Sequence, residues 1–140
     1  MKNIQFIEGA LSPALVTALI EENMQFLSTG AYTIFCGQVR ADVVDAENVT
    51  GIEYTIYERL AFKILEEQIA IALEQYNVHK ISIIHSKGLV KAGGLSVILF
   101  ITSSHRNQAL QAQQALLPVI KFEVPIWKKE LLQNRHSRWA

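Results

Sequence analysis

Two periods of apolar residues run along this chain, and each predicts one kind of element. Alternation at every second residue, or a short unbroken apolar run, indicates a β-strand, whereas repeats at three and four residues indicate a helix. The first pattern predicts strands at residues 4–6, 31–36, 52–57, 80–86 and 95–103. Segment 41–51 is polar and segment 88–94 is rich in glycine, so we expect a loop and a turn-forming link there.

Helical spacing predicts the first two helices. Ser12 can cap a helix whose first position is Pro13, and the apolar stripe that follows should end at Gly30. The clearest helix is segment 58–76, where apolar residues recur on one face.

A third helix is predicted over residues 105–117. Ser103 or Ser104 is placed to cap it, and Pro118 should kink or shorten it because proline lacks an amide hydrogen. The order is then roughly β-α-β-β-α-β-β-α, followed by an irregular tail. This predicts one α+β domain over residues 1–140, with about three helices and an antiparallel or mixed sheet.

Composition narrows the classes of protein. The 140 residues are 50% apolar and 19% charged, which is typical of a folded globular chain. The formal net charge is zero, so a basic site has to be local and a general nucleic-acid or membrane surface is not indicated. The chain lacks a signal-peptide pattern and has one cysteine, Cys36, which together predict a soluble, cytoplasmic protein.

The sequence gives no sign of a metal or a cofactor. Cys36, His79, His85 and His136 lack the spacing of metal ligands. Glycine-rich phosphate loops and the GxSxG motif are absent as well. We therefore expect neither metal nor cofactor.

Three segments carry candidate chemistry, and the first is FCGQVR, residues 35–40. Gly37 lets the backbone turn or approach a ligand closely, and Arg40 can hold an anion with its guanidinium fork. The alternative is a strand-end turn with a solvated arginine.

The second segment is TSSHRN, residues 102–107. His105 and Arg106 begin the third helix, although positive side chains oppose the helix dipole at that end. Their presence favours an anion between them, and the alternative is a capped helix with two exposed polar residues.

The third segment is KFEVPIWKKE, residues 121–130. Pro125 disfavours helical geometry in the residue before it, so Lys121 and Lys128 should belong to two elements joined at a bend. A lysine among other cations and apolar walls has its pKa lowered, which suits a base or a nucleophile. The alternative is a solvated basic face, with Trp127 in the core or at an interface.

The three segments, with YERLA and IIHSKG between them, resemble the large catalytic subunit of molybdopterin synthase. The resemblance implies an α/β-hammerhead fold and a central dimer of two such chains. It implies that each chain binds a small ubiquitin-like subunit whose C-terminal Gly-Gly carries a thiocarboxylate. The implied substrate is cyclic pyranopterin monophosphate (precursor Z), which receives two sulfurs to form the molybdopterin dithiolene.

The resemblance also implies roles for individual residues. Lys121 and Lys128 match catalytic lysines that activate the thiocarboxylate and stabilise its attack, without fixing which one is the base. The pocket in the family draws on both large subunits, so His105 and Arg106 can serve the neighbour's site. The remaining implied roles are anion binding by Arg40, His105 and Arg106, pocket lining by Phe35 and Leu117, and pocket shaping by Pro125 and Trp127.

Two other functions stay open. The chain can be a scaffold that binds the ubiquitin-like partner without turnover, because Ser86, Ala92, Pro118 and Glu123 depart from the family's usual pattern. It can also be a different small enzyme that acts on a phosphorylated heterocycle. Replacing Lys128 separates the first alternative from an enzyme, and a requirement for a thiocarboxylated partner separates the second.

Overall fold

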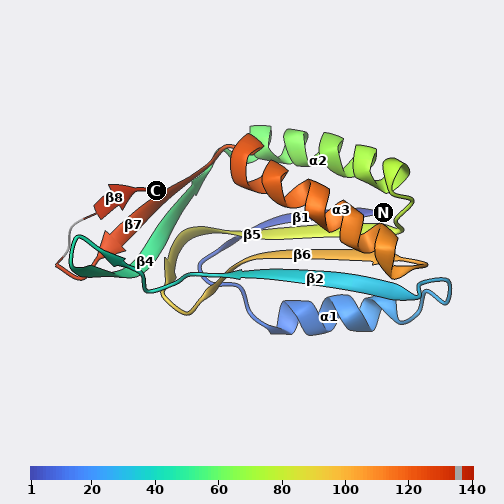
Figure 1. The fold of residues 1–140 in the computed structure, drawn as a ribbon, viewed down its shortest axis with the longest axis horizontal. Helices are drawn as coiled ribbons and strands as arrows, with labels where there is room; N and C mark the ends of the chain where they lie inside the picture. Colours follow the sequence, from blue (N-terminus) through green and yellow to red (C-terminus); the bar gives the residue numbers. More distant parts are fainter. Residues whose placement is uncertain (135–136) are drawn as a thin grey trace.

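The structure is a computed structural model that describes residues 1–134 and 137–140. A long, twisted sheet has two helices on one face and one helix on the other (Figure 1). The strands are β1 Lys2–Glu8, β2 Ala31–Gln38, β3 Val43–Val44, β4 Glu47–Ile56, β5 Lys80–Lys91, β6 Leu95–Ser103, β7 Ile126–Leu132 and β8 Ser137–Trp139. The helices are α1 Ala14–Asn23, α2 Glu58–Gln75 and α3 Arg106–Pro118, and α3 continues into a π-helical turn, η1, Val119–Glu123.

The sheet is mixed, with the order β2-β6-β5-β4-β7-β8. All of these neighbours are antiparallel, whereas β1 pairs in parallel with the first part of β5. Strand β5 pairs with β6 through residues 80–85 and with β4 through residues 88–91, so it belongs to two smaller sheets. The predicted α+β class with three helices and a mixed sheet is confirmed.

Strands β5 and β6 are buried because helices cover both of their faces. Ile81 and Ile83 pack with α2 and α3, whereas Ile84 and Phe100 pack with α1. This burial explains why both strands are unbroken apolar runs in the sequence and do not alternate. None of the helices in the described residues is long and apolar enough to cross a membrane.

Gly88 lies where β5 passes from one small sheet to the other. Its φ is +76°, which side chains rarely adopt, and a Cβ atom there would clash with the carboxylate of Glu8. The bend at this glycine turns β4 and β7 away from the helix-covered part of the sheet, as Figure 1 shows at the left.

Two sequence predictions about the N-terminal half are wrong. The first helix ends at Asn23 rather than before Gly30, and Leu27 is 95% exposed. Ser28 and Thr29 favour turns over helix, and the amide of Thr29 donates a turn hydrogen bond to Phe26. The expected loop 41–51 is instead a hairpin of β3 and β4, closed by left-handed backbone at residues 45–46.

The C-terminal half differs from expectation in three places. The segment expected to be an irregular tail contains β7 and β8, which are held by pairing with β4 and with each other. The sequence does not predict β7, because alternation in IWKKELL is weak. The link 88–94 is shorter than expected, because β5 runs to Lys91. His105, with extended backbone, caps α3 in place of either serine, and its amide donates to the side chain of Gln108.

Candidate functional site

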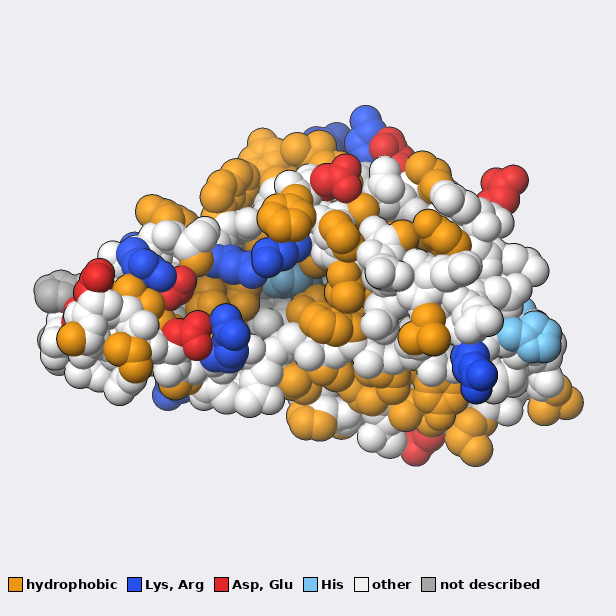
Figure 2. All heavy atoms as spheres, viewed as in Figure 1, with side chains coloured by type: hydrophobic (Ala, Val, Ile, Leu, Met, Phe, Trp, Pro, Cys, Tyr) orange, Lys and Arg blue, Asp and Glu red, His pale blue; other side chains and the backbone are white. Residues whose placement is uncertain are grey.

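A pocket of about 410 Å³ opens where the two small sheets meet the C-terminal end of α3. Figure 2 shows positive side chains (blue) around this hollow, with a histidine (pale blue) at its floor. We call it the lysine pocket. Its lining consists of Phe35, Gly37, Gln38, Val39, Arg40, Asp42, Val49, Ile52, Tyr54, His85, Ser96, Val97, Leu117, Ile120, Lys121, Ile126, Lys128, Glu130 and Ala140.

Two consecutive elements bring Lys121 and Lys128 to the pocket. Lys121 lies in the π-helical turn and Lys128 lies in β7, with the bend at Val124 and Pro125 between them. The amide of Val124 donates to Val119, and the amide of Tyr57 donates to Pro125, so backbone hydrogen bonds fix the bend. The predicted placement of the two lysines on separate elements is confirmed.

Lys128 is the more enclosed of the two lysines. Its pKa is lowered by burial first and by the charge of Lys121 second, while Glu130 opposes both. Among the described residues, neither Lys121 nor Lys128 forms an ion pair, whereas Glu130 pairs with Arg138 at 3.5 Å. The pocket thus holds two cations that lack a carboxylate of their own.

Lys129 is a neighbouring lysine on β7 that is not part of the pocket lining. It follows Lys128 along β7 and therefore points to the opposite face of the strand. Its ammonium lies 5.7 Å from the centre of the Trp139 ring. Lys129 is a natural control for Lys128, because it has the same charge on the same strand.

Arg40 lies at the rim of the pocket. Strand β2 has a register shift between Gly37 and Gln38, and the chain then leaves the sheet. Arg40 pairs with Asp42 at 3.2 Å, and its side chain is 82% exposed. It can therefore reorient toward a ligand at little cost, since exposed ion pairs are weak.

The floor of the pocket is a polar cluster of Tyr54, His85 and Ser96. The rings of Tyr54 and His85 are 5.1 Å apart and meet edge to face. Burial raises the pKa of Tyr54, and a hydrogen bond with Ser96 opposes the shift. The Ser96 hydroxyl also donates to the carbonyl of Gly37 at 3.4 Å, which connects the cluster to the end of β2.

His85 is held as a neutral ring. Its Nδ1 lies 2.8 Å from the carbonyl oxygen of Ser86, and only an N–H can be paired there. Burial lowers the pKa of His85 to about 4, a hydrogen bond to Ser86 opposes this, and the charge of Lys128 adds to it. The other ring nitrogen, Nε2, is then an acceptor in a residue that lines the pocket.

The structure brings together five of the predicted site residues. Phe35, Arg40, Leu117, Lys121 and Lys128 all line the pocket, whereas no atom of His105 or Arg106 does.

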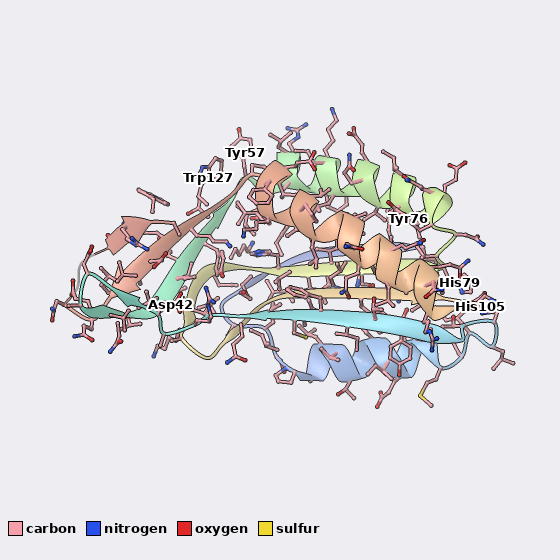
Figure 3. All side chains as sticks on the ribbon, viewed as in Figure 1. Asp42, Tyr57, Tyr76, His79, His105 and Trp127 are labelled. Atoms are coloured by element: carbon pink, nitrogen blue, oxygen red, sulfur yellow. The ribbon has the colours of Figure 1, made fainter. Side chains whose placement is uncertain are left out.

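The other four predicted residues are not part of the lining. His105 is at the far end of α3 from Asp42, as Figure 3 shows, and both His105 and Arg106 are exposed. Trp127 is 50% exposed and, like Pro125, is not part of the lining, so the role of these two residues in shaping the pocket stays a prediction.

Sequence reasoning missed the floor of the pocket. The sequence predictions include His85 only as a possible metal ligand and as part of the motif IIHSKG, and Tyr54 only as an alternating apolar position. The available signal was the strand period: His85 follows Ile81 and Ile83 on the face under α2 and α3, so it had to be buried beside them. Ser96 and Glu130 had no comparable signal, because their pairing depends on contacts distant in sequence.

No cluster of three or more metal-binding side chains occurs in residues 1–134 and 137–140. His136 lies outside the described residues. The expectation of no metal or cofactor therefore stays a prediction.

The pocket has the size of a small-molecule site, with apolar walls and a few convergent polar groups. Lys121, Lys128 and Arg40 give it positive charge, while the protein as a whole is neutral. These features define the class: an α+β protein with a cationic pocket of small-molecule size.

Comparison with known proteins identifies the family. Residues 8–123 match the family model described as MoaE protein. A molybdopterin synthase catalytic subunit of Thermoplasma volcanium is 34% identical over 110 residues, which are 79% of this chain and 80% of that protein. The one from Bos taurus is 31% identical over 136 residues, 97% of this chain and 69% of that protein. The chain belongs to the family of molybdopterin synthase catalytic subunits.

Solved structures agree with this assignment. The complex of subunits 1 and 2 of the molybdopterin-converting factor from Helicobacter pylori contains a chain with a TM-score of 0.84 and 30% identity, which covers 98% of this chain and 89% of that one. Molybdopterin synthase from Staphylococcus aureus gives a TM-score of 0.84 at 26% identity and covers 100% and 98%. The resemblance drawn from the sequence motifs and the hammerhead fold are both confirmed.

Proposed function

We propose that this protein transfers sulfur from the thiocarboxylated C-terminus of a small ubiquitin-like subunit to cyclic pyranopterin monophosphate, forming the molybdopterin dithiolene. The observation that carries the proposal is the pair Lys121 and Lys128, which reach one pocket from two elements without a carboxylate partner. Family membership supplies the reaction class, and the pocket supplies the place for it.

The charges of the pocket suit this chemistry. Both reactants are anions, one through a phosphate and the other through a thiocarboxylate. Lys128 and Lys121 hold the two anions near each other and stabilise charge that develops as sulfur attacks the pterin side chain. Because the pKa of Lys128 is lowered, this lysine is also the better candidate for giving and taking a proton.

Residues at the rim and the walls complete the proposal. Arg40 binds the phosphate end after leaving Asp42, and Phe35 and Leu117 pack against the pterin. The mouth of the pocket accepts the extended C-terminal tail of the small subunit. A two-subunit partnership is supported by a similar protein whose solved structure is a complex of two subunits.

His105 and Arg106 belong to a second copy's site in this proposal. They are exposed at the end of α3 that lies away from the pocket, so they reach a lysine pocket only across a dimer. The working unit is then two of these chains with two small subunits, and its cytoplasmic location stays a prediction.

A non-catalytic scaffold is the alternative function. Three residues that differ from the family's usual pattern can be located in the structure. Ser86 is buried and its carbonyl accepts a hydrogen bond from His85, Pro118 ends α3, and Glu123 is exposed. None of these side chains lines the lysine pocket. This placement favours the enzyme over the scaffold.

The experiment is a reconstitution. The purified chain is mixed with precursor Z and a thiocarboxylated ubiquitin-like subunit, and molybdopterin is assayed for wild type, Lys128→Ala and Lys129→Ala. We expect product from wild type and Lys129→Ala, and a loss of about a hundredfold or more for Lys128→Ala. Lys129 is the matched control because it lies on the opposite face of β7.

Two results would contradict the proposal in different ways. Binding of the small subunit without product from wild type would leave the scaffold. Product from Lys128→Ala at the rate of Lys129→Ala would place the chemistry outside the lysine pocket.

A further inference from the structure

His85 is a buried titratable group that the proposed sulfur transfer does not use. Only 5% of its surface is exposed, and what is exposed faces the lysine pocket. The Nδ1–H group is committed to the carbonyl of Ser86 at 2.8 Å. Within the described residues Nε2 has no hydrogen-bond partner, so its lone pair is available to whatever enters the pocket.

Positive groups outweigh negative ones around this ring. Tyr54 contacts it from β4, Lys128 and Glu130 line the same pocket from β7, and Lys121 does so from the π-helical turn. Arg40 and Asp42 face the pocket after β2, but they pair with each other. Glu130 is engaged by Arg138, so no unpaired carboxylate among the described lining residues is positioned to hold a proton on His85.

An anion in the pocket reverses this balance. It offsets the charges of Lys121 and Lys128, and it gives a protonated Nε2 an acceptor. Both changes favour the imidazolium form, because a nearby opposite charge and a hydrogen bond each stabilise a charged group. The empty pocket disfavours the same form through burial and the charge of Lys128.

We propose that His85 takes up a proton when an anion occupies the lysine pocket and donates a hydrogen bond from Nε2 to that anion. His85 is thus a further anion-binding residue, and anion binding is coupled to pH. The proton comes from solvent, and no covalent bond changes. The inference rests on the proposed function only for the kind of anion, a phosphate or thiocarboxylate, that the pocket receives in the reaction.

The coupling predicts a direction for affinity. A ring that is neutral in the empty protein and protonated in the complex makes the affinity for an anion rise as the pH falls. The rise reaches up to tenfold per pH unit between the two titration midpoints.

Sulfate is a suitable probe, since it mimics phosphate and keeps its charge between pH 4.5 and 8. The experiment follows the histidine ring resonances of the whole chain by NMR from pH 8 to 4.5, in sodium sulfate and in sodium chloride of equal ionic strength. The His85→Gln variant identifies the His85 signal, but the titration itself uses wild type and does not depend on how the variant folds. We expect the His85 midpoint to be at least one pH unit higher in sulfate.

A second measurement links the proton to binding. Sulfate affinity is measured by calorimetry at pH 7 and pH 5 for wild type, His85→Gln and His79→Gln. We expect at least a threefold rise for wild type and for His79→Gln, and a clearly smaller rise for His85→Gln. His79 is the control because it is bonded to Thr29 and Ser104, away from the pocket.

Each other outcome overturns the proposal. Equal midpoints in sulfate and chloride, with other pocket signals shifted by sulfate, would mean that the anion binds without His85 taking up a proton. No response of any pocket signal would mean that the pocket does not take a phosphate-like anion. Sulfur transfer is assayed separately, so loss of that activity and loss of the coupling are distinguishable.

Discussion

The two ends of helix α3 carry the two groups of cations that the sequence singled out, and they differ in how far the chain completes them. At the C-terminal end, Lys121 meets Arg40 and Lys128 around an enclosed pocket with a buried polar floor. At the N-terminal end, His105 and Arg106 are exposed, and no second element closes over them. One end forms a pocket within a single chain, whereas the other contributes to a second copy's site only in the proposed function.

Because of this difference in exposure, the cations at the two ends of α3 need separate tests. Lys128 is partly buried in the pocket, so its charge is less screened by water than that of an exposed cation. A cation on an open surface has little effect until something excludes water from it. Equal loss of activity from both ends would therefore indicate that they meet in an assembly.

The largest expected effect is at the pocket end. Lys121→Ala should lower the turnover of molybdopterin synthesis by about 10²–10³-fold, because one fixed charge that meets a developing anion is lost. Lys63→Ala, which removes an exposed cation on α2, should keep wild-type turnover. Turnover is measured at saturating small subunit. Equal rates for the two variants would show that the pocket lysine has no more effect on turnover than an exposed lysine.

The second effect concerns acid stability. The folded pKa of His85, about 4, lies below its unfolded value of 6.5, so the unfolded chain binds the extra proton between these values. Stability from this group is present above pH 6.5 and is lost as the pH falls toward 4. We expect about 2 kcal/mol of loss between pH 7 and 4.5.

Urea unfolding measures this loss. Over the same pH change, the free energy of unfolding of His85→Gln should fall by about 2 kcal/mol less than that of wild type, because the variant has no ring to protonate. Equal losses in the two proteins would show that the histidine is hydrated or paired in solution.

The third effect tests whether the two ends meet across a dimer. Arg106→Ala and Lys128→Ala should each be nearly inactive alone, because each removes part of every site. After subunit exchange, an equal mixture should regain about a quarter of wild-type activity, since half the dimers are mixed and each has one intact site. No recovery, with exchange shown by mass spectrometry, would place both residues in the same chain's site or outside it.

The smallest effect concerns the rim. Asp42→Asn frees Arg40 from its 3.2 Å ion pair and removes a negative charge from the mouth of the pocket. We expect sulfate affinity at pH 7 to rise a few-fold, with stability changed by less than about 0.5 kcal/mol. A fall in affinity would show that Asp42 positions Arg40 and does not compete for it.

The sequence predicts the helix-covered part of the fold well, because buried residues there form clear apolar patterns along the chain. Segment 58–76 and the apolar runs of β5 and β6 have clear patterns, and the structure has α2 at Glu58–Gln75. The β3–β4 hairpin and strand β7 have weak patterns, since they are stabilised by pairing with distant strands. Tertiary pairing of this kind is not visible in local propensity.

The candidate site shows the same division. The motifs that resemble the family predict Arg40, Lys121 and Lys128 as site residues. Tyr54 and Ser96 could not be found, because their proximity depends on the bend of β5 at Gly88 and on the register of β6. By contrast, the place of His105 and Arg106 at the opposite end of α3 from Lys121 follows from the predicted helix over residues 105–117.

The continuity of β5 has a mechanical consequence. The strand holds β6 and β1 through its first half and β4 through its second, so the pocket floor and the wall that carries Lys128 share one backbone. The two ladders use different residues of β5, 80–85 and 88–91, so the small sheets can move relative to each other only if β5 bends between them. Finer adjustment to a reactant falls to long side chains at the edge of the pocket, such as Arg40.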